Sequence, residues 1–142
     1  MRIIIDSNRV LAAMIKESTT REILLDLFFE FIAPDFILTE IRKHEQRVLK
    51  AAKITRDEFE IILTLILERI TIIPEAEYSP FMGSLTNVIE DPKDIPYLAV
   101  SIASKAYGIW THDFDFAKQH IVKIISNKDM LKLSGKINSH YD

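Results

Sequence analysis

The sequence predicts an α/β sandwich built around a mostly parallel sheet of about five strands. Short apolar runs rich in β-branched residues alternate along the chain with longer segments whose apolar residues recur at helical spacing. Wholly apolar strands are typical of a parallel sheet covered on both faces, and alternation of strands with helices is typical of the same architecture. The 142 residues contain no repeat, low-complexity tract or linker, so we expect a single domain over residues 1–142.

The first half of the chain is predicted to hold three strands separated by helices. The strands are the apolar runs Ile3–Ile5, Phe31–Ala33 and Ile70–Ile73. The helices are expected over Val10–Ile15, over Thr19–Glu30, from an N-cap at Asp35 to about Ala52, and over Phe59–Leu67. The second and third show an apolar stripe at helical spacing, and the last follows Thr55-x-x-Glu58, the pattern of a capping box. A proline after each of the last two strands is expected to end it.

The second half is predicted to add two strands, a long buried helix and a terminal helix. We expect a loop over Glu75–Met82 and a short helix over Ser84–Ile89. A long helix should run from an N-cap at Asp94 to about Ala106, with Gly108 as its C-cap. Strands at Ile109–Thr111 and Val122–Ile125, a helix over Asn127–Leu133 and a polar tail from about residue 135 should follow. Glycine is favoured just after helices because it adopts positive φ without strain.

Composition excludes several classes of protein. The chain has no cysteine, which excludes disulfides and thiolate zinc sites, and no apolar run long enough to span a membrane. No signal peptide is recognisable at the start, so a cytoplasmic location is expected. A net charge of −3 does not suit a strongly basic nucleic-acid binder. Contact with nucleic acid would therefore need a local basic patch or a metal ion.

Acidic residues end or begin several of the predicted elements. Asp6 ends the first strand, Asp94 opens a helix, and Asp113 follows the fourth strand. The carboxyl ends of parallel strands meet at one edge of a sheet, where ligands bind, so we expect these side chains to lie close together. Carboxylates about 4 Å apart would repel by about 4 kcal/mol per pair at an effective dielectric constant of about 20. A bound divalent cation would relieve this repulsion, which indicates metal-dependent chemistry on phosphate.

Each acidic residue also has an ordinary structural explanation. Asp6 could simply cap a helix that begins near Asn8, and Asp94 could cap the helix that follows it. Glu40 lies beside the apolar stripe of its helix, where it could pair with Lys43 on the surface. The metal hypothesis therefore depends on the acidic positions taken together.

A basic stretch lies on the helix that carries Glu40. Its candidate RNA-binding residues are Arg42, Lys43, Arg47 and Lys50. They would either form a solvated helix face or lead a phosphate backbone towards the acidic pocket. The chain has no glycine-rich phosphate loop, no nucleophile elbow and no histidine pair at metal-ligand spacing.

Four acidic segments resemble, in order and spacing, those of the PIN-domain family of metal-dependent nucleases. They are Asp6-Ser7-Asn8, Ile37-Leu38-Thr39-Glu40, Asp94-Ile95-Pro96-Tyr97-Leu98-Ala99 and Trp110-Thr111-His112-Asp113. The resemblance covers roughly Arg2 to Leu133. One departure is Arg9, which stands where the family more often has an apolar residue.

The resemblance implies a three-layer α/β/α sandwich and Mg²⁺- or Mn²⁺-dependent hydrolysis of phosphodiesters, usually in RNA. Many relatives are toxins of toxin–antitoxin pairs, so an antitoxin protein is a possible partner. The implied metal ligands are Asp6, Asp94 and Asp113, with Glu40 completing the set or orienting the attacking water. Further candidates are Asp91 and Asp115 as extra ligands and Ser7, Asn8 and Thr111 as supporting residues.

Two other functions stay open at this point. The chain could be a catalytically silent PIN-like module that binds RNA or protein, or a receiver-like phosphoacceptor domain. The segment Phe59–Leu67 is apolar on more than one face, which predicts that it is covered by a loop or by another subunit. We therefore expect a homodimer that uses this helix, together with Leu24–Phe28.

Overall fold

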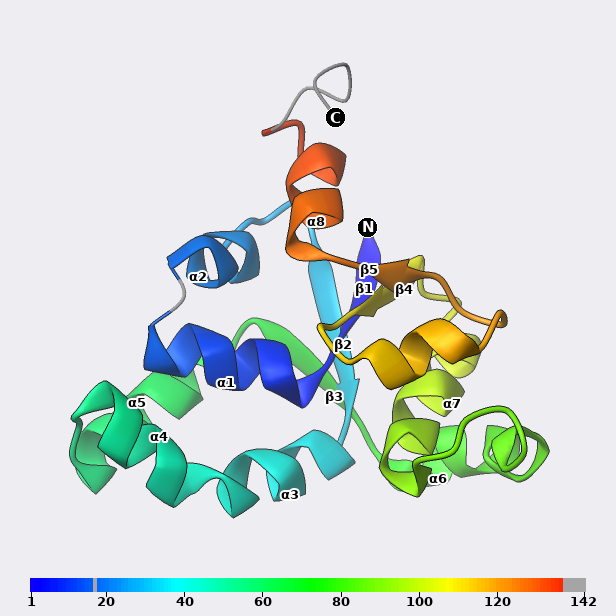
Figure 1. The fold of residues 1–142 in the computed structure, drawn as a ribbon, viewed down its shortest axis with the longest axis horizontal. Helices are drawn as coiled ribbons and strands as arrows, with labels where there is room; N and C mark the ends of the chain where they lie inside the picture. Colours follow the sequence, from blue (N-terminus) through cyan, green and yellow to red (C-terminus); the bar gives the residue numbers. More distant parts are fainter. Residues whose placement is uncertain (17, 137–142) are drawn as a thin grey trace.

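The structure is a computed structural model that describes residues 1–16 and 18–136, and it contains a five-stranded sheet in which all strands are parallel (Figure 1). The strand order is β3-β2-β1-β4-β5. The strands are β1 (Arg2–Ile5), β2 (Glu30–Pro34), β3 (Ile70–Ile73), β4 (Gly108–Trp110) and β5 (Ile124–Ile125). The predicted α/β fold is therefore confirmed.

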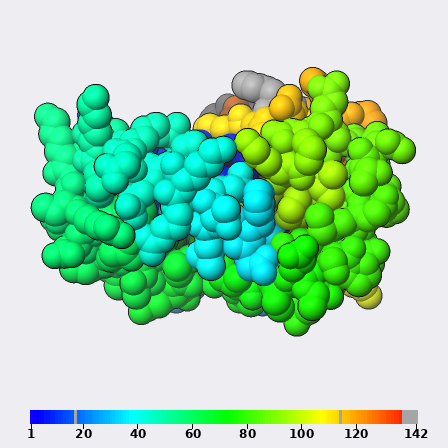
Figure 2. Space-filling model, turned by 90° about the horizontal axis from the view of Figure 1, so that it is seen from below, coloured from blue at the N-terminus to red at the C-terminus, as the bar shows by residue number. Residues whose placement is uncertain are grey.

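The strand order reverses between β1 and β4. From β1 the chain builds outwards through β2 to β3, and it then returns to place β4 on the other side of β1. Ile5 is paired with Trp110, and the next residue, Asp6, donates its backbone N–H to the Trp110 carbonyl at 3.1 Å. In parallel sheets, ligands bind outside the carboxyl ends of the strands at such a reversal. These ends point downwards in Figure 1, and Figure 2 views the molecule from below.

Helices cover both faces of the sheet in three layers (Figure 1). On one side lie α1 (Ser7–Ile15), α2 (Ser18–Leu24), α3 (Phe36–Lys43), α4 (Glu45–Ala52) and α5 (Arg56–Leu67). On the other lie α6 (Glu75–Tyr78) and α7 (Ile95–Ser104), while α8 (Asn127–Leu133) follows β5 and packs on α2. The described part of the chain contains no helix that is both long and apolar enough to cross a membrane.

The core is built from the apolar strands and the helix α7. All three isoleucines of β1 are completely buried, as expected for a central strand with helices on both faces. Trp110 of β4 packs on Phe31 of β2 across β1, with ring centroids 5.6 Å apart. Residues Ile95 to Ser101 of α7 are all buried, so the segment that carries Asp94 into the site is rigidly held.

Several of the predicted helices have different limits in the structure, and the first begins three residues early, at Ser7. The helix expected over Thr19–Glu30 stops at Leu24, and just past its end Arg69 donates hydrogen bonds to the backbone carbonyls of Leu24 and Asp26 at 3.1 and 3.0 Å. The helix expected from Asp35 to about Ala52 is broken at His44 into α3 and α4. The capping box of Thr55 and Glu58 is present as predicted.

Asp35 and the segment after β3 also differ from the prediction. Asp35 does not cap α3 with its side chain. Its carboxylate instead accepts hydrogen bonds from the Tyr78 hydroxyl at 2.7 Å and the Glu75 N–H at 3.1 Å. The loop expected over Glu75–Met82 is therefore helical, as α6 followed by the 3₁₀ helix η1 (Ser79–Phe81). The helix expected over Ser84–Ile89 is reduced to η2 (Gly83–Leu85).

Gly108 is not the C-cap of α7, contrary to the prediction. The helix ends at Ser104, and Lys105 takes the left-handed conformation with φ of 53°. Gly108 instead opens β4, which ends one residue earlier than expected, and β5 is shorter than expected. The helix Asn127–Leu133 is confirmed. Most of the polar tail predicted from about residue 135 lies outside the described residues.

We expect Gly108→Ala to lower the free energy of unfolding by about 1–3 kcal/mol, the usual cost of overpacking. A Cβ at this position would lie 2.7 Å from both the Ile125 Cδ1 atom and the Lys123 carbonyl oxygen. Urea unfolding measures the change. Gly83→Ala is the matched control, because a Cβ there would have no neighbour within 4 Å. Equal stability of the two variants would contradict the close packing of β4 on β5.

Candidate metal centre

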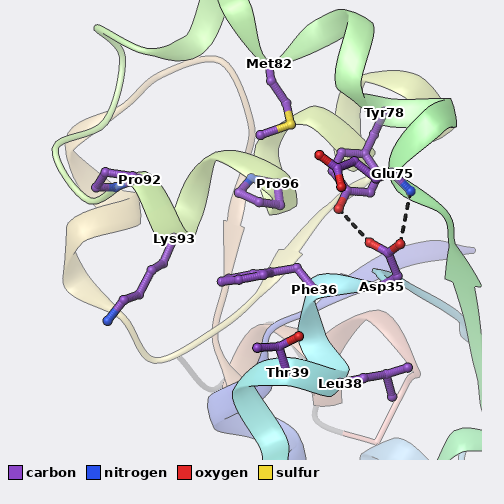
Figure 3. A pocket seen from close by; sticks show the side chains of 10 residues that line it. All are labelled: Asp35, Phe36, Leu38, Thr39, Glu75, Tyr78, Met82, Pro92, Lys93 and Pro96. Carbon is purple, nitrogen blue, oxygen red and sulfur yellow. Dashed lines mark hydrogen bonds between the residues drawn. The ribbon is translucent and has the colours of Figure 1, made fainter. Parts of the chain in front are cut away.

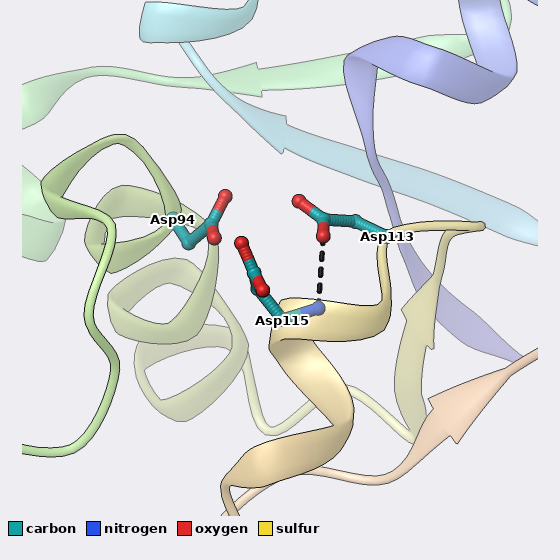
Figure 4. A group of neighbouring side chains, drawn as sticks. All are labelled: Asp94, Asp113 and Asp115. Atoms are coloured by element: carbon teal, nitrogen blue, oxygen red, sulfur yellow. Dashed lines mark hydrogen bonds between the residues drawn. The ribbon is translucent and has the colours of Figure 1, made fainter.

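Three carboxylates converge at the carboxyl edge of the sheet, and they come from two segments (Figure 4). One carboxylate oxygen each of Asp94, Asp113 and Asp115 lies within 4.8 Å of the others. Asp94 ends the 3₁₀ helix η3 (Pro92–Asp94) directly before α7, whereas the other two follow β4. Asp113 also accepts a hydrogen bond from the Asp115 N–H at 2.9 Å, which holds this turn in place. The three side chains could together hold one metal ion.

Asp94 is the member of this group that most needs a partner. Its side chain is buried, and its Oδ2 atom is the one buried side-chain oxygen or nitrogen in residues 1–16 and 18–136 without a hydrogen-bond partner. It does not cap α7 with its side chain, so the ordinary explanation for its position does not hold. Burial raises the pKa of Asp94 to about 8, and the charges of Asp113, Asp91, Asp6 and Asp115 act in the same direction. A bound cation would offset both the burial of the carboxylate charge and its repulsion by the neighbouring carboxylates.

Asp6 lies at the end of β1, where it is 5% exposed, and it serves two purposes. It is the N-cap residue of α1, and its Oδ1 atom accepts a hydrogen bond from the Ser7 N–H at 2.8 Å. Its Oδ2 atom accepts one from the Thr111 hydroxyl at 2.7 Å. Burial raises the pKa of Asp6 to about 6, and the charges of Glu40 and Asp113 add to this rise. Asp6 can therefore cap α1 and also lie beside the metal centre.

A chain of hydrogen bonds links Asp6 to the other acidic residues. The Thr111 hydroxyl oxygen accepts hydrogen bonds from the Asn8 side-chain amide at 3.2 Å and from the Asp113 N–H at 2.9 Å. The Asn8 carbonyl oxygen accepts one from the Arg9 guanidinium at 3.0 Å. Arg9 is only 4% exposed. This residue, which departs from the family pattern, therefore helps to hold the amide that orients Thr111.

Glu40 is not part of the three-oxygen group, although its charge acts on Asp6. The carboxylate is half-buried and accepts a hydrogen bond from the Tyr97 hydroxyl. Burial raises the pKa of Glu40, and the hydrogen bonds from Tyr97 and Ser7 oppose this rise. Burial likewise raises the pKa of Tyr97, together with the charges of Asp6 and Glu40. These contacts place Glu40 at the margin of the site.

Sequence reasoning missed Tyr97. The residue lies in α7, one helical turn after Asp94, and its side chain is completely buried. The i, i+3 spacing after an acidic residue was the available signal, but a buried tyrosine is more often a core residue. Its role in holding Glu40 is visible only once α3 and α7 are placed side by side.

The other candidate residues are more peripheral. Asp91 caps η3 by accepting a hydrogen bond from the Lys93 N–H at 3.0 Å. Among the basic candidates, Arg42 is bound to Glu60 and to Glu45, the latter at 3.0 Å. The other three candidates, Lys43, Arg47 and Lys50, are exposed. Arg42 is therefore occupied within the protein, and only the other three remain available to a phosphate backbone.

The residues of the site suit a hard divalent cation. Mg²⁺ and Mn²⁺ favour carboxylate oxygen and water, and Mg²⁺ is usually held by one or two carboxylates and several waters. Sulfur and imidazole ligands are not part of the group. The unpartnered Oδ2 atom of Asp94 is the observation that fits a cation most directly. The arrangement can hold a metal ion at the carboxyl ends of the neighbouring strands β1 and β4.

Comparison with known proteins agrees with this geometry. The family model described as the PIN domain matches residues 4–131, which is most of the chain. The match includes all four acidic segments and both halves of the sheet. A search of curated proteins found no match.

Without metal, we expect Asp94→Asn to become more stable relative to the wild type as pH rises from about 4 to about 8. Folding raises the pKa of this carboxyl from 3.8 to about 8. Between these values the folded state keeps a proton that the unfolded state has lost, so wild-type stability falls as pH rises. Asparagine does not titrate and escapes this loss. Urea unfolding in EDTA at several pH values measures the difference.

Two controls make this experiment specific. Asp57→Asn removes one negative charge from the exposed start of α5, so it corrects for net charge alone. Mn²⁺ at about 100 times its dissociation constant should stabilise the wild type by about 2.7 kcal/mol and flatten its pH dependence. A stability difference between Asp94→Asn and wild type that is the same at every pH would contradict the raised pKa.

Proposed function

This chain belongs to the PIN-domain family, and we propose that it is a Mg²⁺- or Mn²⁺-dependent endoribonuclease. Members of the family are generally metal-dependent nucleases, and the acidic cluster of Asp94, Asp113 and Asp115 is present here. The observation that carries the proposal is the carboxylate of Asp94: its buried Oδ2 atom has no hydrogen-bond partner in the described residues, and the carboxylate converges with those of Asp113 and Asp115. A protein under no demand for metal binding would gain stability by neutralising this cluster.

The proposed mechanism assigns different tasks to the acidic residues. Asp94, Asp113 and Asp115 would hold the ion, with Asp6 beside them. The ion, when bound, would lower the pKa of a coordinated water and offset charge on the phosphate. Glu40, whose pKa is raised by burial and whose carboxylate accepts a hydrogen bond from Tyr97, would orient the attacking water and accept its proton. Thr111 keeps Asp6 oriented through its 2.7 Å hydrogen bond.

The finer parts of this proposal are predictions. RNA as the substrate, an antitoxin partner and a cytoplasmic location come from the family resemblance and from composition. The alternative of a silent binding module predicts RNA binding without metal-dependent cleavage. A receiver-like phosphoacceptor would instead gain mass on treatment with acetyl phosphate. Incubation of mixed structured and single-stranded RNAs with Mn²⁺, Mg²⁺ or EDTA distinguishes the nuclease from both.

We expect Asp6→Asn to lower metal-dependent RNA cleavage by at least about 10²-fold, which corresponds to about 2.7 kcal/mol in the activation free energy. The substitution keeps the shape of the side chain and can still accept the Ser7 N–H, but it removes the charge beside the metal. Initial rates in Mn²⁺ measure the loss, and EDTA should abolish wild-type cleavage. Asp57→Asn, which lies outside the site, should keep the wild-type rate. Wild-type activity in folded Asp6→Asn protein would exclude the assignment.

We also propose that the protein forms a homodimer through α5. Phe59 and Leu63 on this helix are buried within the chain, but Ile61 and Leu65 are 62% and 58% exposed. The exposed pair lies on the opposite face of the helix from the buried pair. It leaves an apolar surface of the kind that subunit contacts cover. The exposed Leu25 and Leu27, between α2 and β2, are a second apolar surface for such a contact.

Ile61→Glu combined with Leu65→Glu should convert the dimer to a soluble monomer, because the two charges would be placed in an apolar contact. Light scattering at high micromolar concentration measures the oligomeric state. Ile62 and Ile66 pack against the core, so changes there would test folding rather than assembly. A wild-type monomer would reject the dimer, and a dimer that survives both charges would place the contact elsewhere.

A further inference from the structure

A hollow of about 630 Å³ lies next to the acidic cluster, between α3 on one side and α6, η3 and the start of α7 on the other (Figure 3). Such a volume falls in the usual range for small-molecule sites. Its lining is mostly apolar: the ring of Phe36 lies across it, with Pro96 and Met82 on the side of α7 and η1. The hollow therefore offers flat apolar surface at an edge of the sheet that is otherwise rich in charge.

Polar groups are found at the two ends of the hollow (Figure 3). At one end the Asp35 carboxylate accepts hydrogen bonds from Tyr78 and Glu75, so much of its bonding capacity is used within the protein. At the other end the exposed Lys93 extends away from the ring. A ligand that fits this pattern has a flat apolar part and an anionic group on one side.

Residues that line the hollow are direct neighbours in the chain of two of the acidic residues. Lys93 directly precedes Asp94, and Thr39, which also lines the hollow, directly precedes Glu40. Lys93 lies close enough to Glu40 for their charges to interact. A second hollow of about 440 Å³ includes Asp113 and extends towards β5. An extended chain that crosses the cluster would therefore have room on both sides of it.

We infer that the hollow lined by Phe36 is a nucleobase subsite. It binds one base of a single-stranded nucleic acid, next to the phosphate that the metal ion of the acidic cluster would contact. Phe36 stacks on the base, and Lys93 contacts a neighbouring phosphate. The inference rests on the proposed function for the nature of the substrate. A base in a duplex has both faces covered by its neighbours, so the subsite selects unpaired nucleotides.

The test measures binding separately from cleavage. Fluorescence anisotropy follows a labelled single-stranded RNA in Mg²⁺ at constant salt, and gel electrophoresis of each sample confirms that the RNA is intact when its binding is read. Phe36→Ala should weaken binding about tenfold, within the range for the loss of one stacked base. Phe36→Tyr should restore it, because tyrosine keeps the aromatic face. Tyr107→Ala is the control, since Tyr107 is an exposed aromatic residue that directly precedes β4, at the opposite edge of the sheet from the acidic cluster.

A second set of RNAs, each with one abasic position, identifies the group that Phe36 contacts. At one position, removal of the base should weaken binding to the wild type as much as Phe36→Ala weakens binding of the intact RNA. When this abasic RNA is combined with Phe36→Ala, the loss of affinity should be no larger than for either change alone. Losses that add at every position would overturn the inference, because Phe36 would then contact no base. Unchanged affinity of folded Phe36→Ala protein would also overturn it, and would leave the hollow to a protein partner.

The same assays separate this inference from the proposed function. If Phe36→Ala weakens RNA binding but the wild type cleaves no RNA, the nuclease proposal is rejected and the subsite is supported. If the wild type cleaves RNA with Mn²⁺, and Phe36→Ala has the same RNA affinity and the same KM, the nuclease is supported and the subsite is rejected. Lys93→Gln should reduce the salt dependence of log affinity by about 0.7, the value for one phosphate contact to a single strand.

Discussion

The hydrogen bond from the Thr111 hydroxyl to Asp6 joins the two strands on which the site depends. β1 and β4 are neighbours in space but lie about a hundred residues apart in the chain, and their helices leave the sheet in different directions. The bond fixes one carboxylate oxygen of Asp6, while the same hydroxyl accepts the N–H of Asp113 at 2.9 Å. Loss of Thr111 would therefore remove one hydrogen bond from Asp6 and one from the backbone of Asp113 at the same time.

The acidic cluster shows how function and stability are opposed in this fold. Burial and mutual repulsion raise the pKa of Asp6 to about 6 and that of Asp94 to about 8, so the metal-free site favours partly protonated carboxyls. The rest of the molecule supplies stability through a core in which the three isoleucines of β1 are completely buried and α7 is buried over most of its length. A rigid frame of this kind keeps the carboxylates together even when no cation relieves their repulsion.

Local patterns predicted many elements because they depend on residues close in sequence. The strand Ile70–Ile73, the capping box at Thr55 and the helix Asn127–Leu133 were predicted correctly from apolar runs and caps a few residues long. The errors arose where a distant residue intervened. Arg69 binds the carbonyls at the end of α2, and Tyr78 takes the Asp35 carboxylate away from α3. Gly108 was assigned to a cap, but the approach of β5 requires it in β4.

The sequence by itself determined the α/β class, the strands that end in acidic residues, and the positions at which carboxylates would gather, because these follow from periodicity and from the common direction of parallel strands. Only the tertiary structure decided which carboxylates come within reach of one ion. It brought Asp115 into the group with Asp94 and Asp113, whereas Asp6 and Glu40 are not members of this group. Asp6 caps α1, and Glu40 is bonded to Tyr97. Distances between side chains on α3, α7 and the turn after β4 depend on how these segments pack, and no local pattern encodes that packing.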